Sequence, residues 1–199
     1  SEKLRGFSSA TPKVIDLMEF HFFWDIDGDG IPWRSLPDTG MPAYFTRGSG
    51  HNAMAAYSER PDDYQNNLDR LNRKFESAKH LVPAPVVQNE AGAKIGIIAY
   101  GSSDFAVQES RDQLKEEQGI TTSYLRLRAY PFTNEVHDFI KRHDRIYIVE
   151  QNRDAQMRSL LLIDGDPTQA TKLQSVLHYD GMPIDARSIT DAILQKEGK

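Results

Sequence analysis

The chain has 199 residues and a formal net charge of −5, and 39% of its residues are hydrophobic. Such a length allows one domain with a substantial appendage. The acidic balance excludes a nucleic-acid-binding protein that relies on a broad basic face. The absence of cysteine excludes disulfides, thiolate zinc sites, cysteine-held iron–sulfur clusters and a cysteine nucleophile within these residues.

The sequence contains no apolar run near the roughly 20 residues that a membrane span needs. Residues 1–5 hold no apolar signal core either. We therefore expect a cytoplasmic protein without a membrane or nucleic-acid partner. The sequence does not begin with methionine, so we also expect a piece of a longer protein.

Residues 1–58 show little sustained periodicity and are interrupted by proline and glycine. An aromatic run, FHFFW at 20–24, precedes an acidic turn, and more aromatic residues follow. A solvated linker is seldom so aromatic. The pattern predicts an ordered but irregular connecting segment that packs against another protein surface.

Residues 61–81 have the pattern of one amphipathic helix. Pro61 suits the first turn, and Asp62 and Asp63 favour the positive end of the helix dipole. Apolar side chains recur at intervals of four and three residues, which places them on one face. They are Tyr64, Leu68, Leu71, Phe75 and Ala78. Pro83 and Pro85 then begin a linker, so residues 59–93 are predicted as a long helix and a proline-rich connection.

Strands and helices alternate regularly over residues 94–199. The predicted strands are 94–100, 121–128, 145–149 and 172–178, the last at a sheet edge. The predicted helices are 104–118, the segment from Thr133 through Ile140, 155–163 and 184–196. This alternation predicts an α/β fold with a mostly parallel sheet and helices on both faces.

Functional residues of such sheets lie in the loops beyond the carboxyl ends of the strands. Gly101, Ser102 and Ser103 follow a predicted strand and open a helix, where backbone N–H groups can hold an anion. The segment matches neither a phosphate-binding P-loop nor a dinucleotide motif. A plain helix cap is the alternative, and the residues favour it.

A second loop begins with Glu150, which ends an apolar strand and precedes Gln151, Asn152 and Arg153. A carboxylate at that place can act as a base or make hydrogen bonds at an interface. The alternative, slightly favoured, is a carboxylate whose hydrogen bonds are satisfied by neighbouring backbone N–H groups.

The acidic turn places Asp25, Asp27 and Asp29 at alternate positions before Gly30, as at the start of a calcium-binding loop. The pattern then departs, because Leu36 stands where a bidentate glutamate belongs. An Asx-rich turn is the favoured interpretation. A Ca²⁺ or Mg²⁺ ion held by the three carboxylates is the alternative.

No complete catalytic set is evident elsewhere. None of the six histidines forms a zinc-binding H-E-x-x-H motif, and His137 and His143 face different ways on a helix. No G-x-S-x-G segment is present. The residues by themselves predict an α/β fold with an aromatic extension.

Seven segments occur in an order that is typical of one enzyme family. They are DGDGIPWRSLPDTG (27–40), AYFTRGSGH (43–51), NNLDRLNRKFESA (66–78), IGIIAYGSSDFAVQESRDQL (95–114), TSYLRLRAYPFTNEV (122–136), IYIVEQNRDAQMRSLL (146–161) and LHYDGMPIDARSITDAI (177–193). Together they cover nearly the whole chain. In this order the chain resembles the C-terminal part of the α subunit of 2-oxoacid:ferredoxin oxidoreductases, of the 2-oxoglutarate (KorA-like) type.

The resemblance implies that residues 94–199 form a transketolase C-terminal-like domain and that residues 1–93 join it to a pyrimidine-binding domain. The family decarboxylates a 2-oxoacid on thiamine diphosphate. It passes electrons through a [4Fe–4S] cluster to ferredoxin and transfers the acyl group to coenzyme A. The thiamine-activating glutamate lies in the remainder of the α subunit. The cluster and the Mg²⁺–diphosphate site lie on the β subunit.

The resemblance therefore implies a chain that holds none of these cofactors, supports assembly and interfaces, and is inactive alone. Residues 101–103 and 150–153 are expected to face the partner or the cofactor. Two other classes of function stay open. One is a stand-alone α/β module that binds a small anionic ligand at Gly101, and the other is an adaptor domain stabilised by a divalent cation at Asp25, Asp27 and Asp29.

Overall fold

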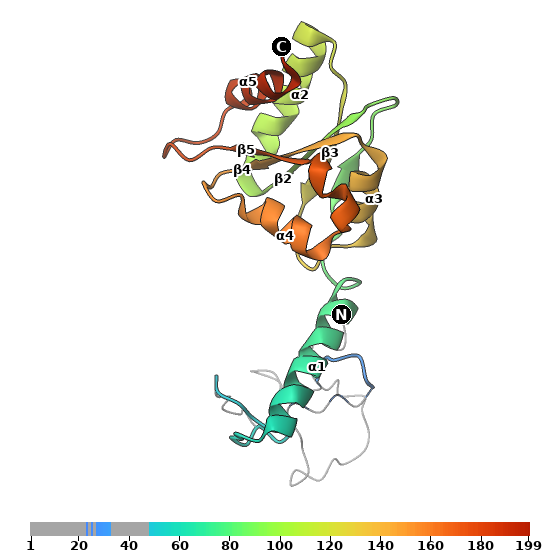
Figure 1. Cartoon of the computed structure of the whole chain (residues 1–199), viewed down its shortest axis with the longest axis vertical. Coiled ribbons are helices and arrows are strands. Elements are labelled where there is room, and N and C mark those ends of the chain that lie inside the picture. Colours follow the sequence, from blue (N-terminus) through green and yellow to red (C-terminus); the bar gives the residue numbers. More distant parts are fainter. Residues whose placement is uncertain (1–22, 24, 26, 33–47) are drawn as a thin grey trace, which may run out of the picture. The chain divides into compact units, whose positions relative to one another are not determined.

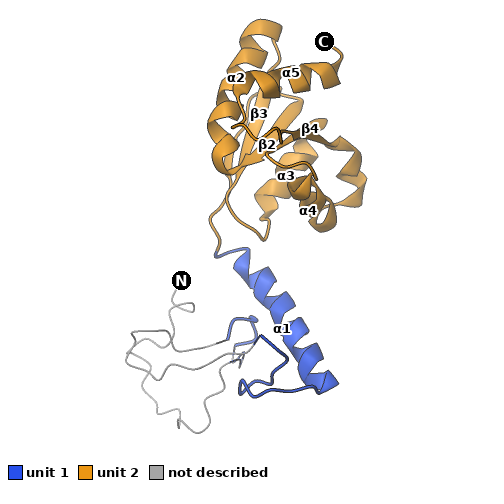
Figure 2. Cartoon of the chain, turned by 90° about the vertical axis from the view of Figure 1, so that its left-hand side faces the viewer, with its two compact units in different colours: residues 1–81 blue, residues 82–199 orange. Residues whose placement is uncertain are grey.

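The computed structural model describes residues 23, 25, 27–32 and 48–199. The chain divides into two compact units, of which the first ends at Leu81 and the second begins at Val82 (Figure 2). Most of the aromatic-rich segment predicted before residue 48, including Trp24 and Trp33, lies outside the described residues.

The second unit is built on one sheet of five strands in the order β1-β3-β2-β4-β5. The strands are β1 (Val86–Gln88), β2 (Ile95–Tyr100), β3 (Thr122–Leu127), β4 (Arg145–Glu150) and β5 (Leu173–Leu177). All neighbouring strands are parallel except β1, which pairs antiparallel with β3. The predicted α/β class and mostly parallel sheet are confirmed, and so is the edge position of the last strand.

Helices cover both faces of this sheet (Figure 1). On one face lie α2 (Asp104–Gln118) and α5 (Ala186–Glu197), and on the other lie α3 (Asn134–Arg142) and α4 (Gln156–Asp164). Because both faces are covered, the strands are apolar on both sides. On β2, for example, Ile97 packs toward α2 and α5, whereas Ile98 packs toward α3 and α4.

Local signals define the helix ends in this unit. Gly119 adopts a left-handed conformation (φ 66°) after α2, and its N–H donates back to the carbonyl of Lys115. Asp185 caps α5 by accepting a hydrogen bond from the N–H of Ser188 at 2.8 Å. The boundaries predicted for α2 are confirmed, whereas α5 begins two residues later than predicted because Asp185 is its cap.

Strand β1 was not predicted, because residues 83–93 read as a proline-rich linker. Its three residues pair with β3, and the side chain of Arg111 on α2 links the two strands. The guanidinium of Arg111 donates to Oε1 of Gln88 and to the carbonyl of Thr122, at 2.5 and 3.0 Å. The strand therefore depends on distant partners rather than on its own sequence.

The first unit contains α1 (Pro61–Ala78), which ends three residues before the predicted helix and continues as turns. Before it, a bridge joins His51 to Tyr57, and the ring of Phe23 stacks on that of His51 with centroids 3.8 Å apart. Within the residues that the structure describes, no helix is both long enough and apolar enough to cross a bilayer.

Gly96 on β2 lies where α3 packs against the sheet. A Cβ atom at this position would lie 2.7 Å from a ring carbon of Phe139 and 2.7 Å from Cδ1 of Ile146. We expect Gly96→Ala to destabilise the second unit by about 1–3 kcal/mol, because the core must shift to admit the methyl group. Urea unfolding measures this effect.

Gly48→Ala is the matched control, since a Cβ at Gly48 has no atom within 4 Å and should leave the second unit unchanged. Equal stability of the Gly96 variant and the wild type would show that this face of the core is loosely packed.

Candidate functional site

The loops after β2 and β4 meet at the carboxyl edge of the sheet because these strands are adjacent and parallel. The amide Nε2 of Gln151 lies 3.1 Å from Oγ of Ser102 and 3.1 Å from Oγ of Ser103. Residues 101–103 and residues 150–153, which the sequence predicts as separate loops, therefore lie side by side.

Glu150 is fully buried, and both of its carboxylate oxygens accept hydrogen bonds. Oε2 accepts from the N–H of Met157 at 2.7 Å and from Nδ2 of Asn152 at 2.9 Å, and Oε1 accepts from the N–H of Arg158 at 3.1 Å. Two of these donors belong to the first turn of α4, whose positive end also favours a negative charge. The carboxylate is thus the cap of α4, and it is not placed as a general base.

The residue that directly precedes α4 is Ala155, which offers no capping side chain and has a left-handed backbone with φ 51°. Asn152 supplies a second acceptor, since its Oδ1 accepts from the N–H groups of Asp154 and Gln156 at 3.1 and 3.3 Å. The side chain of Arg153 pairs with Asp154 at the exposed rim of the loop. Glu150 and Asn152 therefore replace the missing local cap.

Tyr100 ends β2 beside this network. Its hydroxyl oxygen lies 3.4 Å from Nδ2 of Asn152. Burial and the negative charge of Glu150 raise the pKa of the Tyr100 phenol, more than the hydrogen bond from Asn152 lowers it. The phenol therefore stays protonated at neutral pH and is available as a hydrogen-bond donor.

The start of α2 already holds a negative charge. Residues Gly101–Ser103 form a short 3₁₀ turn, and the buried carboxylate of Asp104 follows it. Asp104 accepts from the hydroxyl of Tyr124 at 2.8 Å and pairs with Arg126 at 3.0 Å. The carboxylate of Asp104 at the first residue of α2 disfavours a second anion at residues 101–103, and Ser103 makes no side-chain capping hydrogen bond. Asp104 belongs to the loop that the sequence indicates, whereas Tyr124 and Arg126 were not singled out as its partners.

A hollow of about 280 Å³ opens at the same edge. Its walls are mostly apolar and come from the ends of β2 and β3, the loop after β3, and α4. The lining residues are Tyr100, Gly101, Leu127, Arg128, Ala129, Tyr130, Phe132, Met157 and Leu160. Arg128 is the charged side chain among them, so the hollow suits an apolar group that carries an acid. It contains no pair of nucleophile and base.

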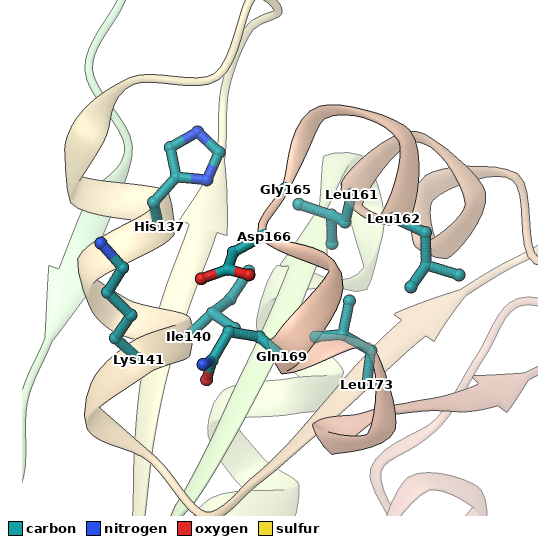
Figure 3. A pocket seen from close by; sticks show the side chains of 9 residues that line it. All are labelled: His137, Ile140, Lys141, Leu161, Leu162, Gly165, Asp166, Gln169 and Leu173. Atoms are coloured by element: carbon teal, nitrogen blue, oxygen red, sulfur yellow. The ribbon is translucent and has the colours of Figure 1, made fainter.

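Figure 3 shows a second hollow, between α3 and the segment from α4 to β5. His137 and Lys141 of α3 lie on one wall, and Asp166 and Gln169 lie on the other. Nε2 of His137 is 3.5 Å from a carboxylate oxygen of Asp164. No side chain in this hollow completes a nucleophilic set with the histidine.

The acidic turn packs against α1 in the first unit. Carboxylate oxygens of Asp25, Asp27 and Asp29 lie within 4.8 Å of one another. Oδ1 of Asp25 accepts from the N–H of Gly30 at 2.9 Å, and Oδ2 pairs with Nη2 of Arg73 at 3.1 Å. Arg73 supplies one positive charge beside the three carboxylates, whose oxygens lie close enough together to serve as ligands of one divalent cation.

Gly30 shows how closely the turn approaches the helix. It has a positive φ of 83°, and a Cβ here would lie 2.1 Å from the backbone nitrogen of Lys74. The carbonyl of Gly30 accepts from Nη1 of Arg70 at 3.1 Å, and that of Asp29 accepts from Oγ of Ser77 at 2.6 Å. The turn is therefore a packing element of the first unit.

No protein-family model and no curated protein matches the chain. Among solved structures, the chain is similar to the 2-oxoglutarate:ferredoxin oxidoreductase of Magnetococcus marinus, a structure with 2-oxoglutarate, coenzyme A and succinyl-CoA bound. The TM-score is 0.68 at 19% identity, over 87% of this chain and 32% of that one. The likeness shows a shared fold, and the chain spans about a third of that protein's length.

Two weaker likenesses also occur. One is to a split-gene transketolase, an inactive β4 tetramer (TM-score 0.44, 16% identity, 56% of this chain and 40% of that one). The other is to the α chain of a probable 2-oxoacid ferredoxin oxidoreductase of Thermoplasma acidophilum (TM-score 0.38, 23% identity, 58% of this chain and 98% of that one). Neither score is high enough to carry an argument.

The cap of α4 gives a direct test. We expect Glu150→Ala to destabilise the second unit by about 1–3 kcal/mol, because two amide groups and Asn152 lose a buried acceptor. The amides of Met157 and Arg158 should exchange faster with solvent hydrogen. Urea unfolding and amide exchange measure both effects. Asp154→Ala is the control, because Asp154 lies in the same loop but is exposed. Unchanged amide hydrogen exchange of Met157 and Arg158 in the Glu150 variant would contradict the capping role.

The acidic turn gives a second test. We expect the thermal midpoint of the wild type to be the same with calcium and with a chelator, because Arg73 already neutralises Asp25. The thermal midpoint of Asp27→Ala should likewise be the same with calcium and with a chelator. The thermal midpoint of Arg73→Gln should be lower than that of the wild type under both conditions. A calcium-dependent rise in the wild type that Asp27→Ala abolishes would establish the cation site instead.

Proposed function

We propose that this chain is the C-terminal region of the α subunit of a 2-oxoacid:ferredoxin oxidoreductase of the 2-oxoglutarate type. Its role there is to support the assembly and the interfaces of an enzyme that oxidatively decarboxylates a 2-oxoacid and acylates coenzyme A. The chain contributes no complete catalytic set of its own.

One observation carries the proposal. The shared fold with the Magnetococcus enzyme extends over 87% of this chain, including residues beyond the sheet unit. The sequence segments that resemble the α subunit run from residue 27 to residue 193. A single α/β domain of another family would account for the sheet but not for the segments before it.

The chemistry of the carboxyl edge agrees with a supporting role. Glu150 serves as a helix cap, and the two hollows described above do not join a nucleophile to a base. Gln151 and Arg153 lie at the exposed rim of the same loop. In the proposal, the loops at residues 101–103 and 150–153 face the partner subunit or the cofactor region through their exposed residues, which are Gly101, Ser102, Gln151 and Arg153.

The cofactors of the reaction belong to the rest of the assembly. Thiamine diphosphate with Mg²⁺ supplies the decarboxylation chemistry, and a [4Fe–4S] cluster carries electrons to ferredoxin. The chain has no cysteine to hold a cluster, which agrees with a cluster on the β subunit. Its partners are then the remainder of the α subunit and the β subunit.

One observation favours a second candidate. The hollow beside Tyr100 is apolar and has Arg128 at its wall, so it could accept a small apolar acid in a stand-alone binding module. The adaptor held by a divalent cation has less support, because Arg73 already pairs with Asp25, one of its three carboxylates.

The isolated chain should not reduce ferredoxin or a viologen dye when given 2-oxoglutarate, thiamine diphosphate, Mg²⁺ and coenzyme A. Absorbance of the reduced dye measures this directly. Reconstitution is the more informative experiment. An α subunit that lacks this region is expressed together with its β subunit, and this truncated complex should be inactive. It should regain activity when this chain is added. Turnover by the chain alone, or failure to bind the truncated complex, would overturn the proposal.

A further inference from the structure

The hollow beside Tyr100 is lined by apolar side chains from the sheet, the loop after β3 and α4. Leu127 and Phe132 line it and are buried, whereas Tyr130 is 50% and Leu160 40% exposed. The ring of Tyr130 meets that of Phe132 edge-on, with centroids 5.1 Å apart. An apolar cavity of about 150 Å³ holds one benzene ring. The hollow of about 280 Å³ therefore has room for one aromatic ring with a short side chain.

One lining side chain offers a hydrogen-bond donor. The hydroxyl oxygen of Tyr100 accepts from Nδ2 of Asn152, so this contact does not use the phenolic hydrogen. The negative charge of Glu150 also acts on this phenol. A ligand group at the Tyr100 hydroxyl is therefore best an uncharged oxygen, because an anion there would be repelled.

A charged donor lies at the neighbouring strand end. Tyr100 pairs with Leu127 across β2 and β3, and Arg128 directly follows Leu127. Nη1 of Arg128 donates to the carbonyl of Ala84 at 3.5 Å, which uses one of the five N–H groups of the guanidinium. Arg128 is the charged side chain of the lining, so it suits one carboxylate. A phosphate or a dicarboxylate would bring a second charge that the lining does not neutralise.

We propose that this hollow binds a small aromatic monocarboxylate that carries an uncharged oxygen on its ring. The carboxylate pairs with Arg128, and the ring lies against Phe132 and Leu160. The ring oxygen accepts the hydrogen bond from Tyr100. The proposal rests on the second candidate function given above and gives its ligand class. A ligand this small in an open hollow binds with a dissociation constant on the order of 1 mM.

Nuclear magnetic resonance of the ¹⁵N-labelled full chain tests the ligand class, with 4-hydroxyphenylacetate as the probe. The amides of Gly101, Ala129 and Leu160 should shift and saturate. Tyramine has the same ring but an ammonium group in place of the carboxylate, so it should bind at least about tenfold more weakly. 2-Oxoglutarate should cause no saturable shift at these amides. This last result separates the hollow from the substrate of the proposed enzyme, and ferredoxin reduction plays no part in the measurement.

Two variants test the roles of the donors. Arg128→Gln should weaken the binding of 4-hydroxyphenylacetate about five- to tenfold. Tyr100→Phe should weaken it about fivefold, yet leave the binding of phenylacetate unchanged, because phenylacetate has no ring oxygen. Arg142→Gln is the control, since Arg142 is exposed and precedes β4 at the opposite edge of the sheet. Its affinity should equal that of the wild type.

Four results would overturn the proposal. They are the absence of a saturable shift with 4-hydroxyphenylacetate, equal affinity for tyramine, saturable shifts with 2-oxoglutarate, and unchanged affinity of Arg128→Gln. An equal loss for phenylacetate and 4-hydroxyphenylacetate in Tyr100→Phe would overturn the placement of the ring oxygen. The amide spectrum of each variant without ligand shows whether it is folded.

Discussion

Parallel pairing of neighbouring strands is the constraint on which the second unit depends. A chain that must return to the same edge before each new strand has to cross a face of the sheet, and here it crosses as α2, α3 and α4, while α5 follows the last strand. The crossing helices cover both faces, so the strands can be apolar throughout. The same constraint collects the ends of β2, β3, β4 and β5 at one edge. Whatever this unit binds, its polar loops are gathered there.

The polar side chains at that edge make hydrogen bonds that stabilise the fold. Glu150 and Asn152 satisfy the first turn of α4, and Asp104 joins Tyr124 and Arg126 beneath the start of α2. Both carboxylates are buried and hydrogen-bonded, and Asp104 also pairs with the charge of Arg126, as a low-dielectric site requires. A loop built in this way is rigid, and rigidity suits a surface that holds subunits together. This rigidity is one argument for the supporting role that we propose.

The features that the sequence could predict are those with local causes. The limits of α2 follow from its pattern and from Gly119, and the strands of the parallel core follow from their apolar runs. Strand β1 could not be found, because its three residues are held by β3 and by Arg111, which lies 23 residues beyond Gln88. The contact of Gln151 with Ser102 and Ser103 depends on the order of the strands in the sheet, which no local sequence pattern predicts. The role of Arg73 at the acidic turn depends on a contact across 48 residues.

The remote cap of α4 also bears on the order in which the chain folds. Helix α5 carries its own cap in Asp185, three residues from the amide that it binds. The first amides of α4 are instead capped by Glu150 at the end of β4. Its carboxylate can bind them only after β4 has formed and the chain has reversed direction at Ala155. Helix α4 therefore has little structure of its own in the unfolded chain, and its nucleation is coupled to the sheet. Helices α2 and α5 can form early, whereas α4 joins in the same cooperative step as β4.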